Sequence, residues 1–268
     1  MLKGLSLFDK PYLKKLHNGV LIEVCPVDHI QRNLLWYGFY EKESILTWEK
    51  FIHEDSMVID IGANIGYYTL VAARKATRGK IHSFEPTPTS FRALEQNVLL
   101  NKLPNVIANP AGISNVNSNE KYYIASPDNS GMSGLMPSEN FSGQIEIVEI
   151  ITLDHYSQKH DLQKIDFIKI DIEGNELKAL QGMQQVLTRF KPIIFIELLE
   201  EHLHKFDSSI KEVYDFFKLN GYEPYLIEEA GRLKRLYDIR ESEMMVFIPQ
   251  GYRIPSTVHS PQSTARTQ

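Results

Sequence analysis

From Met57 onward the chain alternates short apolar segments with segments of helical periodicity, and this alternation constrains the fold most. The apolar runs are rich in Ile, Val and Phe and bounded by Gly, Pro or Asn, as buried strands are. They are 57–61, 80–85, 105–110, 165–171, 192–197, 223–229 and 243–249. Between two of them, Ile210, Val213 and Phe217 have the spacing of a helix lying on a sheet. Repeated strand–helix–strand units predict a mostly parallel, doubly wound α/β sheet covered on both faces.

The limits of the domain follow from the same pattern. Segments 223–229 and 243–249 are joined without an apolar stripe, which indicates a hairpin and an antiparallel last strand. We therefore expect a seven-stranded sheet whose last strand is antiparallel. Residues 1–50 are predicted to form an N-terminal cap, 51–252 the α/β domain, and the polar residues 253–268 a disordered tail.

Composition excludes several classes of protein. The formal net charge of −5 disfavours nucleic acid as the main partner. The single cysteine, Cys25, excludes an intrachain disulfide framework and a cysteine-based zinc cluster. No apolar run approaches the roughly 18 residues of a membrane span. The first residues lack the apolar stretch of a signal peptide, so the cytoplasm is the expected compartment. The oligomeric state stays open.

Acidic residues end several of the predicted strands. Asp60 precedes a turn that runs from Gly62 through Asn64 to Gly66, and Glu85 ends the second strand. An acid at that second tip binds ribose hydroxyls in nucleotide-binding sheets. Asn64 stands where dinucleotide sites have their middle glycine, and Asp60 would repel a pyrophosphate. The expected ligand is therefore a phosphate-free adenosine with a cationic end, and S-adenosylmethionine fits.

The loop after the third strand, "NPAGISN", is the expected place for adenine. Short backbone there can approach a ring, and the topology brings the loop to the ligand edge of the sheet. Asn109 and Gly112 are the candidate contacts, with Ser114 as a further one. Residues 113–150 interrupt the strand–helix rhythm and are predicted to be a long loop on short strands. Within it, residues 130–134 are a candidate lid.

Four segments together resemble a known family. "VIDIGANIGYYT", "FEPTPTSFRALEQN", "IDFIKIDIEGNELKALQGM" and "PIIFIE" are similar to the FkbM family of S-adenosylmethionine-dependent methyltransferases, over roughly residues 15–249. The resemblance implies a class I methyltransferase fold, Rossmann-like, for the domain at 51–252. It also implies methyl transfer to a hydroxyl of a sugar or secondary metabolite, so that the expected partner is a small-molecule or glycan acceptor.

Asp171 is the candidate catalytic residue. It ends the fourth strand, and its "KIDIEGNE" segment matches the family's Asp-x-Glu-Gly pattern. Methyl transfer from a sulfonium needs positioning, and a hydroxyl acceptor needs a base for its proton. The alternative role is stabilisation of the following helix N-terminus, which Glu173 or Glu176 could also fill. If Asp171 is not the base, His29 and His155 are backup candidates, and the sequence does not choose between them.

No metal ligand is assigned from the sequence. A Mg²⁺ or Ca²⁺ ion held by Asp60, Asp171 and Glu197 is possible, because these acids end neighbouring strands, but it is not expected. His202 and His204 diverge on a helix and do not make a zinc pair. Two other functions stay open: an NAD-dependent oxidoreductase on a Rossmann-like sheet, and a non-catalytic module that binds the cofactor.

Overall fold

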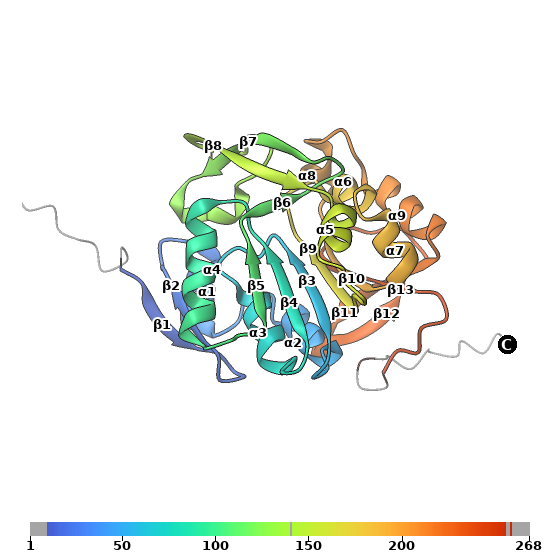
Figure 1. Cartoon of the computed structure of the whole chain (residues 1–268), viewed down its shortest axis with the longest axis horizontal. Helices are drawn as coiled ribbons and strands as arrows, with labels where there is room; N and C mark the ends of the chain where they lie inside the picture. Colours follow the sequence, from blue (N-terminus) through green and yellow to red (C-terminus); the bar gives the residue numbers. More distant parts are fainter. Residues whose placement is uncertain (1–9, 140, 256–257, 259–268) are drawn as a thin grey trace, which may run out of the picture.

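A computed structural model describes residues 10–139, 141–255 and 258 of the chain. The strands of its main sheet are β3 (Met57–Ile61), β4 (Lys80–Phe84), β5 (Val106–Asn109), β9 (Phe167–Ile170), β10 (Ile193–Leu198), β11 (Tyr222–Glu228), β12 (Arg232–Arg235) and β13 (Ser242–Pro249). Their order across the sheet is β12-β11-β13-β10-β9-β3-β4-β5 (Figure 1). The five strands from β10 to β5 are parallel.

The predicted antiparallel last strand is confirmed. β13 lies between β10 and β11 and is antiparallel to both. The seven predicted strands are all present, and β12 adds an eighth by pairing with the outer edge of β11. Only Leu233 of β12 is buried, so its apolar pattern was too short to reveal a strand in the sequence.

Helices cover both faces of the main sheet. Their bounds are α1 (His29–Tyr37), α2 (Lys42–Phe51), α3 (Tyr67–Lys75), α4 (Pro88–Leu100), α5 (Leu153–Lys159), α6 (Glu176–Gln181), α7 (Gln184–Phe190), α8 (Glu200–His204) and α9 (Ile210–Leu219). Successive strand residues face opposite layers. Val58 packs in the core with α2 and α3, whereas Ile59 packs in the core with α6, α7 and α9. The sheet is therefore doubly wound, as expected.

The N-terminal region packs on the same sheet. Strands β1 (Tyr12–Lys15) and β2 (Leu21–Val24) form an antiparallel pair. In α2, the fully buried Trp48 lies 4.9 Å from the ring of Phe195 on β10. The predicted boundary after residue 50 falls inside α2, which belongs to the helical layer. The predicted tail at 253–268 lies mostly outside the described residues.

A small sheet covers the end of the main sheet at which its parallel strands finish (Figure 1). It consists of β6 (Ala111–Ile113), β7 (Ser118–Ala125) and β8 (Phe141–Ile151), in the order β6-β8-β7. A short helix, η2 (Pro127–Met132), joins β7 to β8, and η3 (Glu229–Gly231) joins β11 to β12. The region predicted as a loop is thus mostly a β-hairpin with a helical tip.

The strand order reverses beside β3, whose neighbours are β4 on one side and β9 on the other. In open α/β sheets, ligands bind at the carboxyl ends of the strands next to such a switch point. Among the described residues, no helix is both long enough and apolar enough to span a bilayer.

Candidate functional site

A pocket opens at this switch point, between the ends of β3, β4, β9 and β10. Four carboxylates line it: Glu85, Asp171, Glu173 and Glu197. Gly62 and Asn64 of the glycine turn line it as well, as do residues of α1 and η2. The pocket therefore brings the candidate cofactor residues and the candidate catalytic residue to one place. Among the described lining residues there is no lysine or arginine.

The glycine turn is tight because two strand ends meet there. Gly62 has a φ of +77°, and a Cβ atom at this position would lie 1.9 Å from the carbonyl oxygen of Asp171. The amides of Gly62 and Ala63 both donate to the carbonyl of Phe84, at 3.0 Å. Only glycine fits this conformation and this approach without strain. The turn thus leaves backbone exposed at the floor of the pocket.

Glu85 lies where a ribose-binding acid was predicted. Its Oε2 accepts the amide of Asn64 and its Oε1 accepts the amide of Thr87, both at 2.8 Å. The residue is 6% exposed, and burial raises the pKa of its carboxyl while the amides of Thr87 and Asn64 lower it. A carboxylate has about four acceptor positions, so two remain for ligand hydroxyls.

Asp60 does not line the pocket. It is fully buried, and its Oδ2 accepts the hydroxyl of Thr69 at 2.5 Å. Its other oxygen lies 4.0 Å from Nζ of Lys169. Burial raises the pKa of Asp60, and the Lys169 charge opposes that shift. The predicted direct contact with a cationic ligand is corrected here, because the side chain turns below the glycine turn and supports Lys169 instead.

Gly66 and Asn109, which were also predicted to bind the cofactor, make contacts within the fold. Gly66 precedes α3, where an added Cβ would lie 2.7 Å from Leu94. Asn109 donates to the carbonyl of Ser83 at 3.1 Å and accepts the hydroxyl of Tyr156 at 3.1 Å. Neither is among the residues that line the pocket. Their side-chain and backbone contacts shape the sheet edge, and a contact with the cofactor stays a prediction.

Gly112 lines a small apolar side pocket that lies beside the main pocket and shares Gly62, Tyr122 and Ile172 with it. Its walls are the side chains of Ile61, Pro86, Ile113, Tyr122, Leu135, Ile150 and Ile172. Asn175 also lines it, and its buried Oδ1 has no hydrogen-bond partner among the described residues. Such an acceptor suits an exocyclic amino group. The sequence analysis missed Asn175, since its only signal was its place after the Asp-x-Glu-Gly segment.

Asp171 lies at the pocket with a cation beside it. Its Oδ2 is 3.0 Å from Nζ of Lys169, and that side chain is 4% exposed. Burial lowers the pKa of Lys169, but the carboxylates of Asp171 and Asp60 outweigh it and raise the value. Glu176 holds the turn before α6, because its Oε1 accepts the amides of Ile172 and Gly174 at 3.1 Å. Among the described residues, no side chain caps the N-terminus of α6, so Asp171 does not fill the alternative role of a cap.

Glu173, Glu197 and His202 converge at the other end of the pocket. Nδ1 of His202 lies 3.1 Å from Oε2 of Glu173 and 3.7 Å from Oε2 of Glu197. Burial and the charges of Asp171 and Glu176 raise the pKa of Glu173 to about 8. Burial and the charges of Asp171 and Glu173 raise the pKa of Glu197. Acidic side chains are thus concentrated beside Asp171, and their burial and mutual repulsion favour the protonated forms of Glu173 and Glu197.

The helix η2 closes the pocket from above. Oδ2 of Asp28, the N-cap of α1, accepts the amide of Ser130 at 3.0 Å and its hydroxyl at 2.7 Å. A Cβ on Gly131 would lie 3.2 Å from Ile30 of α1 and 3.7 Å from the Asn64 side chain. The candidate lid therefore contacts both α1 and the glycine turn, and its opening would free the pocket.

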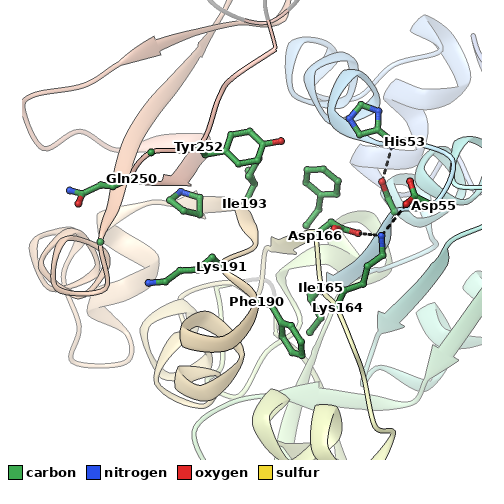
Figure 2. Close-up of a pocket in the computed structure, with 15 residues that line it drawn as sticks. His53, Asp55, Lys164, Ile165, Asp166, Phe190, Lys191, Ile193, Gln250 and Tyr252 are labelled. Atoms are coloured by element: carbon green, nitrogen blue, oxygen red, sulfur yellow. Dashed lines mark hydrogen bonds and ion pairs between the residues drawn. The ribbon is translucent and has the colours of Figure 1, made fainter.

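A larger hollow of about 730 Å³ lies at the opposite edge of the sheet (Figure 2). Residues at the starts of β3, β9 and β10 line it. Three of its charged groups pair with one another, since Nζ of Lys164 is 3.0 Å from Asp166 and 3.4 Å from Asp55, and Nζ of Lys191 donates to the carbonyl of Asn220. Because ligands of such sheets bind at the carboxyl ends, the pocket at the switch point is the candidate site.

Comparison with known proteins gives the same family as the sequence motifs. A family model described as the methyltransferase FkbM domain matches residues 60–224. A protein named Methyltransferase 1 from Beauveria bassiana is 26% identical over 149 residues, which are 48% of this chain and 59% of that protein. This chain thus spans about three-fifths of the length of that relative.

Two further matches cover more of the chain. The hexuronic acid methyltransferase AglP from Haloferax volcanii is 28% identical over 65% of this chain and 70% of its own. A crystal structure of methyltransferase FkbM from Methylobacillus flagellatus has 13% identity and a TM-score of 0.47, over 82% of this chain and 59% of that one. The region that the family model matches begins at Asp60. It contains the glycine turn and the four carboxylates that line the pocket.

Proposed function

Because the chain belongs to the FkbM family of methyltransferases, we propose that it transfers a methyl group from S-adenosylmethionine to a hydroxyl group of a small-molecule or glycan acceptor. The family and the α/β fold with its antiparallel β13 make it a class I methyltransferase. The cofactor, the acceptor atom and the residue roles below are the proposal.

One observation carries the cofactor assignment. The pocket contains Glu85, which has free acceptor positions for two ribose hydroxyls, and it shares Gly62, Tyr122 and Ile172 with the apolar side pocket, where Oδ1 of Asn175 is buried and unpaired. In the proposed complex the side pocket, whose volume is about 20 Å³ in this structure, widens to admit adenine, and the adenine amino group donates to Asn175. Gly62 lines both pockets. Glu85 and Asn175 thus match the two polar ends of an adenosine.

The charges of the pocket favour a cationic ligand. Four carboxylates line it, and the described lining residues include no lysine or arginine. A pyrophosphate would meet acidic side chains there and no lysine or arginine on the described lining, whereas the sulfonium and ammonium groups of S-adenosylmethionine would stabilise the ionised carboxylates. This argues against NAD and the oxidoreductase alternative, which family membership also disfavours.

The acceptor is placed at the acidic end, next to Asp171. In the proposed step, the acceptor oxygen forms a bond to the methyl carbon, the bond from that carbon to sulfur breaks, and the hydroxyl proton passes to Asp171. Lys169 holds the carboxylate in position at 3.0 Å. The relative named as a hexuronic acid methyltransferase supports a sugar acceptor. Most of the rate would come from alignment of the reacting atoms.

Calorimetry and a labelled-methyl assay test this function. We expect S-adenosylhomocysteine to bind one site per chain and NAD not to bind. Labelled S-adenosylmethionine should transfer its methyl group to hydroxylated metabolites or glycans of the native host. NAD binding, or absence of S-adenosylhomocysteine binding by the folded protein, would overturn the cofactor assignment.

The role of Asp171 is tested separately with a matched pair of variants. Asp171→Asn should bind S-adenosylhomocysteine within a few-fold of wild type and lose about 100-fold or more of its turnover, the range of general base catalysis. Asp207→Asn is the control, because Asp207 is exposed and its φ of +55° also suits asparagine. Unchanged turnover in Asp171→Asn would remove this residue from the mechanism. No transfer by wild type to any acceptor would favour the non-catalytic alternative.

A further inference from the structure

We propose that Glu173, Glu197 and His202 form a binding site for one divalent first-row transition-metal ion, Mn²⁺ or Zn²⁺, at the acceptor end of the pocket. One ligand atom from each of these residues lies within 4.8 Å of the other two. Glu173 follows β9, Glu197 belongs to β10 and His202 to α8. Three separate elements thus supply one ligand each.

The three ligand atoms make no hydrogen bond among the described residues, and their contacts with one another are ion pairs only where His202 is protonated. Oε2 of Glu173, Oε2 of Glu197 and Nδ1 of His202 are all buried and make no hydrogen bond there. The His202 side chain is 9% exposed and points Nδ1 into the cluster, although the nearest carboxylate oxygen is only 3.1 Å away. Buried polar atoms normally have a partner. A cation between the three would give each of them one.

The spacing suits metal bonds. Metal–nitrogen and metal–oxygen bonds of about 2.1 Å place neighbouring ligand atoms roughly 3 to 3.5 Å apart. Nδ1 of His202 is 3.1 Å and 3.7 Å from the two carboxylate oxygens, so small side-chain rotations complete the set. An imidazole with two carboxylates favours Mn²⁺ or Zn²⁺ over Ca²⁺, which takes oxygen ligands.

A carboxylate lies near the outer side of the histidine ring. Nε2 of His202 is 3.5 Å from Oε1 of the exposed Glu201, which is the place where a metal-binding histidine commonly has an outer carboxylate partner. Gly174, with φ of +111°, allows α8 to approach: a Cβ atom there would lie 2.1 Å from the carbonyl oxygen of His202. The same turn holds Glu173 at a φ of +57°.

Glu173 and Glu197 also line the pocket, so the remaining coordination positions of the ion face the space assigned to the acceptor. An acceptor oxygen bound there would lie beside Asp171. This second step depends on the proposed methyl transfer. The binding of the ion does not depend on it.

The binding test uses the purified full chain after treatment with a chelator. Calorimetry and electron paramagnetic resonance with MnCl₂ should show one tightly bound Mn²⁺ per chain, with coupling to an imidazole nitrogen. Zn²⁺ should compete for the same site, and Ca²⁺ should bind at least about tenfold more weakly. Absence of a one-to-one site for Mn²⁺ and Zn²⁺, or a Mn²⁺ signal without nitrogen coupling, would overturn the proposal.

Variants assign the ligands. His202→Gln and Glu197→Gln should each weaken Mn²⁺ binding by more than the roughly 10- to 100-fold expected for loss of an outer-shell partner. His204→Gln is the matched control, because His204 lies on the same helix, is exposed and pairs with Glu200. It should bind like wild type. Equal binding by Glu197→Gln, or loss of binding in His204→Gln, would contradict the assignment.

Two measurements separate folding and function from the metal. Circular dichroism checks that each variant is folded. S-adenosylhomocysteine binding is measured on the same samples. Metal binding without nucleoside binding would contradict only the proposed function, whereas the reverse would contradict only the metal site.

Discussion

Replacement of Glu85 by glutamine tests the physical basis of the nucleoside site. Each oxygen of this buried carboxylate accepts one backbone amide at 2.8 Å, from Asn64 and from Thr87. A glutamine has one acceptor oxygen, so its amino group must face one of the two N–H groups. A hydrogen bond to a charged group contributes about 1.5–3 kcal/mol, and the protein should lose about this much free energy of unfolding.

The same substitution should also weaken the binding of S-adenosylhomocysteine. A carboxylate can accept both ribose hydroxyls, whereas the amide can accept only one. Loss of about 1.5–3 kcal/mol corresponds to a Kd for S-adenosylhomocysteine that is about 10- to 150-fold higher. Calorimetry at a temperature where the variant is folded measures this change. A separate urea titration measures stability.

Glu95→Gln is the matched control for this prediction. Glu95 is exposed on α4, so the same chemical change should leave both the Kd and the free energy of unfolding within error of wild type. If Glu85→Gln binds S-adenosylhomocysteine as tightly as wild type, the carboxylate does not hold the ribose and the placement of the adenosine is wrong.

Three further predictions concern the turn, a buried histidine and the lid. Gly62→Ala should lose about 2–5 kcal/mol of stability in urea, because it combines a φ of +77° with a Cβ 1.9 Å from the Asp171 carbonyl; wild-type stability would refute the close approach. Burial lowers the pKa of His82 to about 4, so between pH 6.5 and about 4 the unfolded chain binds a proton at this histidine that the folded chain does not bind. As the pH falls through that window, the free energy of unfolding of wild type should therefore decrease by on the order of 3 kcal/mol more than that of His82→Gln. Parallel profiles of unfolding free energy against pH would refute this prediction. Ser130→Ala removes the 2.7 Å bond to Asp28 and should release S-adenosylhomocysteine roughly tenfold faster in stopped flow; an unchanged rate would show that the lid does not limit release.

The sequence predicted those features that depend on local periodicity. Alternation of apolar runs with helical stripes indicated the parallel strands, the covering helices and the antiparallel last strand. Glycine and acid at the strand ends located the pocket, because parallel strands bring their carboxyl ends to one edge. Gly62, Asn64, Glu85 and Asp171 were predicted for this reason, and the structure brings them into one pocket.

Side-chain direction at the edge of the sheet was not available from those patterns. Asp60 and Glu85 both belong to strand ends, yet Asp60 turns into the core beside Thr69 and Glu85 turns toward the pocket. The period of two assigns residues to a face of the sheet, but it does not say which face opens onto the ligand. The direction of Asn109, whose side chain bonds Ser83 and Tyr156, could not be read from the sequence for the same reason.

Convergence of distant residues was decided only by tertiary structure. Glu173, Glu197 and His202 meet because Gly174 lets α8 approach the turn after β9. Asp28 meets Ser130 across 102 residues because the β7–β8 hairpin folds back over the strand ends. Local sequence sets which element each residue belongs to, whereas the packing of elements against each other sets which side chains share a space.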